Sequence, residues 1–258
     1  MLVKDIIKVI EEFAPLSNQE SWDNCGLCMG SENAVVTGVL LALDCTEETV
    51  DEAIRKGLNL IVTHHPMIFS GVRKICPDNW QGRIIIKAAS FGINIYAAHT
   101  SADKVAGGVS FAMAARLGLS DVEILDKDGN GNGLGAVGNL GKHYSLQEMV
   151  AFVKDRFRLQ ALRCSRPDDI PISRVAVCGG SGSSLIGKAM ASGAQLYITG
   201  DISYHHFFTE KDFMLMDIGH YESEIDIVDI LFSLIKKNFP TFAVCITENI
   251  YSNPIFYF

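Results

Sequence analysis

The stretch Leu60-Ile61-Val62-Thr63-His64-His65-Pro66 decides the fold and the chemistry that this sequence predicts. Its apolar, β-branched first half is typical of a buried strand, and two histidines stand where that strand ends. Open α/β sheets bind their ligands at the carboxyl ends of strands. Because side chains along a strand alternate between its faces, one metal ion rarely takes both imidazoles. Past the strand end, where Pro66 keeps His65 extended, the pair can fan apart and serve two neighbouring metal ions.

The elements around this stretch alternate between strand and helix. An amphipathic helix is predicted over 2–14, a loop over 15–30 and a strand over 35–43. Segment 44–48 predicts a turn and a capped helix start, and Gly57 ends that helix. A helix near 80–91 and a strand over 93–98 follow the histidines. This order is typical of a parallel sheet with crossover helices.

The second half of the chain repeats the pattern of the first. We therefore predict an α/β protein of two similar α/β domains related by internal duplication, mostly three-layer sheets flanked by helices. The expected first domain, 1–125 plus 217–258, carries most of the candidate ligands, and 126–216 forms the second. Segment 126–133, rich in Gly and Asn, predicts a mobile turn or a domain junction. A shift of 136 positions without gaps matches Val39 with Val175, Ala53 with Ala189, Gly57 with Gly193, Leu60 with Leu196 and Thr63 with Thr199.

Composition excludes several classes of function. The 258 residues carry a formal net charge of -8, so the basic footprint of a nucleic-acid-binding protein is absent and we expect no nucleic-acid partner. The sequence has no apolar run of about 18 residues, which predicts no membrane span. The start, Met1-Leu2-Val3-Lys4-Asp5, lacks the pattern of a signal peptide, so we expect a cytoplasmic protein. Cys25-Gly26-Leu27-Cys28 has zinc-knuckle spacing without a second such pair, so we expect no metal there.

Two further segments supply candidate ligands. His99 and Asp103 follow the strand over 93–98, and His220 and Glu224 stand four residues apart at the start of a helical run. Singly, each has a structural interpretation: Asp103 can cap the helix over 109–117, and Glu224 can be a solvated first-turn acid. Together they suit zinc, iron, manganese or cobalt. Two such ions can share and activate a bridging water, which favours hydrolysis.

Two segments of the second half are candidates for contact with a substrate. The glycine-serine loop over 179–184 follows an apolar strand, and it either holds a phosphate or makes a tight turn. His205 and His206 follow the strand that matches the strand of the histidine pair. They are either acid-base groups or exposed loop residues.

These motifs, taken together, resemble the YbgI-type (Nif-three-like) dinuclear metal proteins, often labelled GTP cyclohydrolase 1 type 2. The resemblance runs from Met1 to Phe258 and implies two similar domains facing each other in a ring-shaped homohexamer, a trimer of dimers. It also implies two divalent metal ions per chain (zinc, iron or manganese), held by His64, His65, Asp103, His220 and Glu224. The motifs are Glu20-Ser21-Trp22-Asp23-Asn24-Cys25-Gly26-Leu27, Thr63-His64-His65-Pro66, His99-Thr100-Ser101-Ala102-Asp103, Gly179-Gly180-Ser181-Gly182, Thr199-Gly200-Asp201 with Tyr204-His205, and Gly219-His220 with Glu224.

The family label implies an activity, the opening of the imidazole portion of GTP with loss of formate. We therefore expect a dinuclear-metal-dependent hydrolase with a small-molecule substrate, in which His99 and His205 move protons as catalytic groups. Hydrolysis of another nucleotide or phosphoester by the same metals stays open. The competing class is a non-catalytic, metal-binding ring that acts as a scaffold or regulatory protein. Some members carry a large inserted domain in mid-chain, for which this chain is too short.

Overall fold

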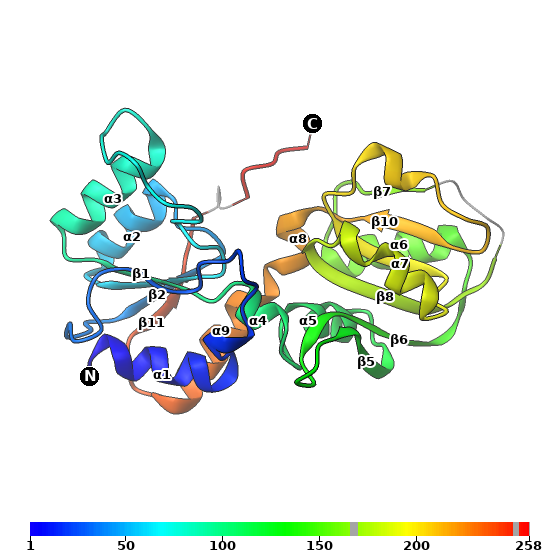
Figure 1. Cartoon of the computed structure of the whole chain (residues 1–258), viewed down its shortest axis with the longest axis horizontal. Coiled ribbons are helices and arrows are strands. Elements are labelled where there is room, and N and C mark those ends of the chain that lie inside the picture. The colour runs from blue at the N-terminus through cyan, green and yellow to red at the C-terminus, as the bar shows by residue number, and fades with distance from the viewer. Residues whose placement is uncertain (166–169, 250–252, 258) are drawn as a thin grey trace. The chain divides into compact units, whose positions relative to one another are not determined.

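The computed structural model describes residues 1–165, 170–249 and 253–257, and the chain forms two compact units. Unit 1 consists of Met1–Ala102 and Ile227–Pro254, and unit 2 of Asp103–Asp226 and Ile255–Phe258 (Figure 1). Each unit is built on one sheet with helices packed against it. The predicted α/β class with two similar domains is confirmed.

The sheet of unit 1 surrounds the strand of the histidine pair with parallel neighbours. Within the described residues its strand order is β1-β4-β3-β2-β11, with β1 antiparallel to β4 and the other pairs parallel. The carboxyl ends of β3 and β4 therefore meet at one edge of the sheet, where the candidate ligands follow. The strands are β1 (Gly26–Met29), β2 (Val39–Ala42), β3 (Leu60–Thr63), β4 (Asn94–Ala97) and β11 (Val244–Ile246).

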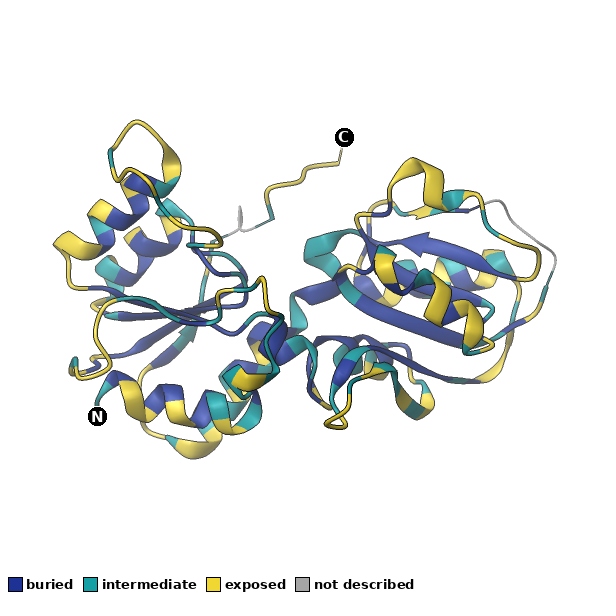
Figure 2. Cartoon of the chain, in the orientation of Figure 1, coloured by how far each residue is buried: buried dark blue, intermediate teal, exposed yellow. Residues whose placement is uncertain are grey.

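Helices cover both faces of this sheet. In Figure 1, α2 and α3 lie on one face, and α1 and α9 lie on the other. Every residue of β2, β3 and β4 is buried (Figure 2), as expected for parallel strands covered on both sides. Leu40 and Ile61 of the strands pack with Val50 of α2 and Ile84 of α3. The helices are α1 (Val3–Phe13), α2 (Glu47–Lys56), α3 (Trp80–Ser90), α9 (Asp226–Asn238), the short α4 (Thr100–Asp103) and the 3-10 turn η1 (Leu16–Asn18).

The sheet of unit 2 is mixed. Within the described residues its order is β5-β6-β8-β9-β10-β7. The central strands β8, β9 and β10 are parallel, whereas β5 with β6, β6 with β8, and β7 with β10 are antiparallel. The strands are β5 (Ser120–Lys127), β6 (Gly133–Tyr144), β7 (Arg163–Cys164), β8 (Ile172–Ser181), β9 (Leu196–Gly200) and β10 (Met214–Asp217).

Side chains of β8 alternate between two apolar clusters, one on each face of this sheet. Val175 and Val177 pack with α5 and α6, whereas Ala176 and Cys178 pack with α7. This period of two is that of a strand with both faces covered, so unit 2 is also a three-layer arrangement. The helical segments are α5 (Val109–Arg116), α6 (Leu146–Phe157), α7 (Ile186–Ala191), α8 (His220–Glu224), η2 (Ser183–Leu185) and η3 (Tyr204–Phe207).

The internal duplication is visible in the strand register. Val39 of β2 lies opposite Leu60 of β3, and the residues 136 positions later, Val175 and Leu196, lie opposite each other in β8 and β9. Both pairs of strands are parallel and are connected through a helix, α2 in one unit and α7 in the other. The two halves thus share a strand-helix-strand motif in the same register.

The extents of the two units differ from the predicted domains 1–125 plus 217–258 and 126–216. Segment 126–133 contains the turn between β5 and β6, two paired strands of unit 2, so it joins strands of one sheet rather than two domains. The carboxylate of Asp128 holds this turn by accepting the N–H groups of Asn130 and Asn132, at 2.8 and 3.1 Å. The unit also includes β10, which pairs with β9, and α8, which packs on β8.

Most predicted elements occur close to their expected positions, with two differences. The expected loop over 15–30 contains β1, because this short segment pairs with β4 as an edge strand. Asp103 does not cap the helix over 109–117, since the N-cap of α5 is Gly108 and Asp103 lies in α4. Among the described residues, no helix is both long enough and apolar enough to cross a membrane.

Candidate metal centre

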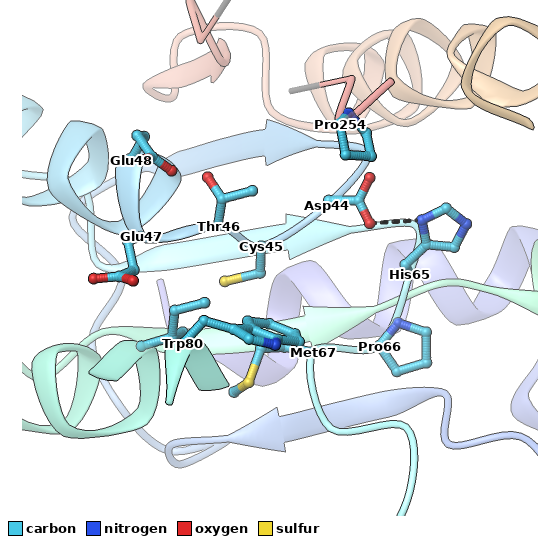
Figure 3. A pocket seen from close by; sticks show the side chains of 11 residues that line it. Asp44, Cys45, Thr46, Glu47, Glu48, His65, Pro66, Met67, Trp80 and Pro254 are labelled. Carbon is cyan, nitrogen blue, oxygen red and sulfur yellow. Dashed lines mark hydrogen bonds and ion pairs between the residues drawn. The ribbon is translucent and has the colours of Figure 1, made fainter. Parts of the chain in front are cut away.

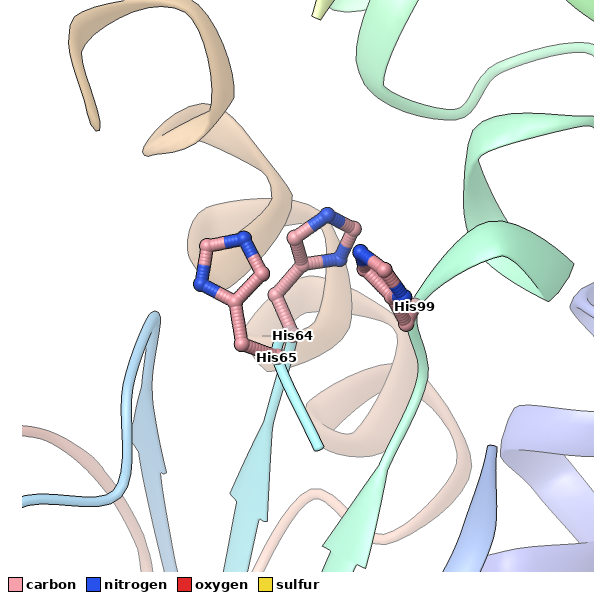
Figure 4. Close-up of side chains that lie close together, drawn as sticks. All are labelled: His64, His65 and His99. Carbon is pink, nitrogen blue, oxygen red and sulfur yellow. The ribbon is translucent and has the colours of Figure 1, made fainter. Parts of the chain in front are cut away.

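Three histidines of unit 1 bring their imidazole rings together beyond the carboxyl ends of β3 and β4 (Figure 4). The ring centroid of His64 lies 5.0 Å from that of His65 and 5.2 Å from that of His99, and the last two are 5.4 Å apart. One ligand atom from each of the three lies within 4.8 Å of the other two. This group of imidazoles has the spacing needed to hold a metal ion.

The backbone explains how two adjacent histidines contribute to one group. The N–H groups of His64 and His65 both donate to the carbonyl oxygen of Leu43, at 3.2 and 3.0 Å. The hydroxyl of Thr63 donates to the carbonyl oxygen of His65 at 2.7 Å, which closes the turn. The chain therefore leaves the regular strand geometry directly after β3. The two rings are inclined by 53° instead of pointing to opposite faces of the sheet.

Each of the three imidazoles is oriented through its Nδ1 atom. The partners are oxygen atoms that only accept hydrogen bonds, so Nδ1 carries the hydrogen and Nε2 is the nitrogen that each ring would offer to a metal. Such outer contacts are typical of metal-binding histidines, and the donor set therefore fits a divalent ion. The pairs are His64 Nδ1 with Ala98 O (2.8 Å), His65 Nδ1 with Asp44 Oδ1 (2.8 Å) and His99 Nδ1 with Asp23 Oδ1 (2.9 Å).

Asp23 is the most constrained of these partners, and its side chain is fully buried. Besides His99, its carboxylate accepts the N–H of Thr100 at 3.1 Å, the hydroxyl of Thr100, and the thiol of Cys25 at 3.0 Å. Burial by itself raises the pKa of Asp23, but the hydrogen bonds from His99, Thr100 and Cys25 outweigh it and hold the pKa well below its usual range. Asp23 is therefore an ionised group that fixes the orientation of His99.

Unit 2 contributes a second set of donors on α8. His220 and Glu224 lie one turn apart, and their Nε2 and Oε2 atoms are 3.1 Å from each other, so the predicted pairing on one helix face is confirmed. The Nδ1 atom of His220 donates to Asp201 Oδ2 at 2.7 Å. Asp201 follows β9 and matches His65 after the shift of 136 positions. The duplicated strand end thus bears a carboxylate that orients a histidine.

Glycines make room for this second set. A Cβ atom on Gly180, whose φ is +60°, would lie 2.2 Å from Glu224 Oε1, and one on Gly200 would lie 2.9 Å from the backbone nitrogen of His220. Gly180 also donates its N–H to Ser223 Oγ at 2.9 Å. Only glycine allows β8 and β9 to approach α8 this closely.

The glycine-serine loop over 179–184 is occupied with internal contacts. The N–H of Gly182 donates to Thr199 Oγ1 at 3.0 Å, and that of Gly180 donates to Ser223 as described above. These two backbone donors are thus engaged within the protein. Of the two interpretations from sequence, close packing of the loop therefore accounts for its glycines.

Asp103 belongs to the same electrostatic environment as Glu224. Burial, together with the negative charges of Asp103 and Glu224, raises the pKa of the Cys178 thiol to about 12. Both carboxylates therefore lie within electrostatic range of the end of β8 in unit 2. Glu224 is only 3% exposed and Asp103 is half-buried.

The two predicted catalytic histidines differ in their surroundings. His99 belongs to the group of three imidazoles in unit 1, so it has the position of a metal ligand as well as that of an acid-base group. His205 lies on η3 of unit 2, is exposed, and contacts the ring of Tyr204 at a centroid distance of 5.3 Å. His206, next to it, contacts Ser203 at 3.1 Å.

Sequence reasoning missed the carboxylates that orient the histidines. The sequence indicated a turn at Asp44, and Asp23 and Asp201 stood only within the motifs of the family resemblance, without a role of their own. Asp23 and His99 are separated by 76 positions, and no local pattern relates them. For Asp44 and Asp201 the signal in retrospect is an acid within two residues after β2 and β9, since the carboxyl ends of adjacent parallel strands share one edge.

The chain was compared with known proteins. A family model described as Duf34/NIF3 (NGG1p interacting factor 3) matches residues 1–254. A protein of Clostridium acetobutylicum named GTP cyclohydrolase 1 type 2 homolog is 40% identical over 227 residues, which cover 86% of this chain and 85% of that protein. The crystal structure of a hypothetical protein from Staphylococcus aureus matches with a TM-score of 0.92 and 29% identity, over 100% of this chain and 99% of that one.

A Bacillus cereus protein related to NIF3 shares the fold, with a TM-score of 0.90, 24% identity, and coverage of 100% of this chain and 99% of that one. The matched family model spans both units and includes every candidate ligand. The chain therefore belongs to the Duf34/NIF3 family.

Proposed function

We propose that this protein is a dinuclear-metal-dependent hydrolase that acts on a nucleotide. The observation that carries the proposal is the group of three imidazoles in unit 1, each held at Nδ1 by an oxygen acceptor. Preoriented imidazoles of this kind are typical of metal centres. The proposed ligands of two divalent ions (zinc, iron or manganese) are His64, His65, Asp103, His220 and Glu224.

Two divalent ions supply Lewis acidity, which activates water and stabilises negative charge on the substrate as a bond breaks. The chain's own contribution is to orient the ligands and to move protons. Asp23 accepts the hydrogen on Nδ1 of His99, so the other ring nitrogen, Nε2, is the one that can accept a proton and return it. His205 is the second proposed proton-transfer group.

GTP is the first substrate to test, because the relatives in several bacteria carry the name GTP cyclohydrolase 1 type 2 homolog. The reaction that this name implies releases formate, which can be measured directly. The proposal also includes a cytoplasmic homohexamer with a small-molecule substrate. Size-exclusion chromatography with light scattering tests the hexamer, and a monomeric mass would contradict it.

Metal content per chain is the decisive measurement, made by elemental mass spectrometry on protein purified without chelator or nickel affinity. We expect about two ions per chain. His64→Asn preserves an amide donor toward Ala98 but removes Nε2, so it should lose metal. The matched control is His143→Asn, because His143 is an exposed histidine on β6.

Activity is then measured as formate release from GTP, with the metal that the protein contains. Turnover that is lost in Glu224→Gln and kept in the exposed-site control His143→Asn supports the hydrolase. Full metal content without turnover on any nucleotide would contradict the hydrolase and favour a metal-binding scaffold. A metal content that His64→Asn leaves unchanged would contradict the ligand assignment.

A further inference from the structure

A cavity of about 400 Å³ opens beside His65 in unit 1 (Figure 3). Its wall includes Asp44, which binds Nδ1 of His65 at 2.8 Å, and the first turn of α2. The volume lies in the range that small-molecule sites occupy in proteins. A molecule in this cavity would have one end at a histidine of the candidate metal centre.

The floor of the cavity is apolar. Cys45, Met67 and Ile84 line it and are 5%, 5% and 1% exposed, so their side chains are packed against the core of unit 1. The indole of Trp80, at the start of α3, lines the same cavity and is 57% exposed. An exposed tryptophan at the side of an apolar cavity offers a flat surface on which a planar ring can stack.

Carboxylates set the electrostatic character of the cavity. Asp44, Glu47 and Glu48 line it, and the described lining residues include no lysine or arginine. Glu47 is partly neutralised, because Arg83 lies 2.8 Å from its Oε1 atom, whereas Glu48 is exposed. These carboxylates accept hydrogen bonds from N–H donors and repel anions. A phosphate therefore does not belong in this cavity.

We propose that this cavity binds the ring of the substrate, an uncharged, planar nitrogen heterocycle that carries N–H donors, such as an amino-substituted nucleobase. The ring stacks on Trp80 over the apolar floor, and its N–H groups donate to the carboxylates of the rim. Any phosphate of the substrate stays outside. The proposal rests on the proposed function only in that the bound ring lies next to His65, so binding to the cavity can be measured in protein stripped of metal.

Isothermal titration calorimetry of the whole chain, dialysed against EDTA, tests the cavity with guanosine, adenosine and cytidine as probes. We expect at least one of these uncharged nucleosides to bind, and Trp80→Ala to weaken its binding at least tenfold. Phe91→Ala is the matched control, because Phe91 is an exposed aromatic residue at the other end of α3, and it should leave the affinity unchanged. Inorganic triphosphate should neither bind to the cavity nor compete.

A second variant tests the rim. Glu48→Lys exchanges an exposed carboxylate for an ammonium group, so it should weaken the binding of the neutral nucleoside and strengthen that of its 5′-monophosphate relative to wild type. Three results would each overturn the proposal. None of the three nucleosides binds, Trp80→Ala binds the nucleoside with the affinity of wild type, or inorganic triphosphate competes with the nucleoside.

The cavity and the metal centre fail separately. Nucleoside binding without metal in the native protein would leave the cavity proposal standing and contradict the hydrolase. Two metal ions per chain without nucleoside binding would overturn the cavity proposal and leave the metal centre standing.

Discussion

Gly180→Ala tests the stability of unit 2 separately from its proposed contribution to metal binding. The backbone of Gly180 has φ +60°, a region that costs a residue with a Cβ atom roughly 1–2 kcal/mol. The new Cβ would also lie 2.2 Å from Glu224 Oε1, where 3.4 Å is an ordinary contact. The carboxylate must therefore move by about 1 Å, a displacement of the size that can cost an active site ~100-fold.

Gly193→Ala is the matched control for this variant. Gly193 lies in the same unit, has φ +77° and would place its Cβ in open space, with no atom within 4 Å. Both variants bear the backbone cost, which lowers the melting temperature by roughly 2–4 °C for each kcal/mol in a protein of this size. Only Gly180→Ala displaces Glu224, so only this variant should lose metal affinity, by about 10–100-fold.

The assay is competitive titration with a metal chelator, beside thermal unfolding followed by circular dichroism. A metal affinity in Gly180→Ala equal to that of wild type would refute the reasoning, because Glu224 would then not depend on its contact with β8. A loss of metal in Gly193→Ala that matches the loss in Gly180→Ala would refute it as well. Metal would then respond to the stability of unit 2 in general.

Three further predictions follow from the contacts of unit 1. Asp23 accepts hydrogen bonds from both His99 and the N–H of Thr100, and the amide of Asp23→Asn cannot accept both, because its NH₂ group is a donor. This variant should therefore lower metal affinity about 10–100-fold, measured by chelator competition. Burial opposes the charge of Glu52, but hydrogen bonds from Lys56 and Thr247 hold the pKa of its carboxyl below the usual value. The ionised carboxylate therefore stabilises the folded protein fully at neutral pH, and this contribution disappears as the pH falls through the lowered pKa. Glu52→Gln should therefore be less stable than wild type in urea at pH 7, and the difference should shrink below roughly pH 4. Ile61→Ala removes a fully buried side chain from β3 and should cost about 2–5 kcal/mol in the same urea assay.

Each of these variants has a matched control at an exposed position of unit 1. Asp78→Asn should leave metal affinity unchanged, and Glu12→Gln should show no such dependence of stability on pH. Ile86→Ala, on a residue that is 39% exposed, should cost much less than Ile61→Ala. A metal affinity in Asp23→Asn equal to wild type would mean that His99 does not need its partner. A pH-independent loss in Glu52→Gln would contradict the assigned pKa shift.

Local sequence patterns were sufficient for the elements and for the type of fold. Alternation between apolar strands and capped helices depends on residues a few positions apart, so α2 and α3 follow from the pattern directly. The shift of 136 positions even predicted the equivalent strands, which pair in the same register in both sheets. The pattern was weakest for β1, because an edge strand of four residues has too few positions to show a period.

The division of the chain required the tertiary structure. A turn rich in Gly and Asn has the same composition whether it joins two domains or two strands of one sheet. The pairing of β5 with β6 shows that this turn joins two strands of one sheet. Asp103, His220 and Glu224 therefore belong to unit 2, although the sequence assigned them to the domain of His64.

The sequence by itself determined the α/β class, the duplication, and which histidines and acids end the strands or start α8. Those features are local, because a strand end and a helix start are set by neighbouring residues. Only the tertiary structure decided which carboxylates orient the imidazoles. Asp23 reaches His99 across 76 positions, because β1, which begins after Asp23, runs antiparallel to β4 and starts at the edge where β4 ends. Asp44 reaches His65 across 21 positions, because the parallel strands β2 and β3 end at the same edge. No pattern within a short window contains that pairing, since it is set by the order and register of the strands.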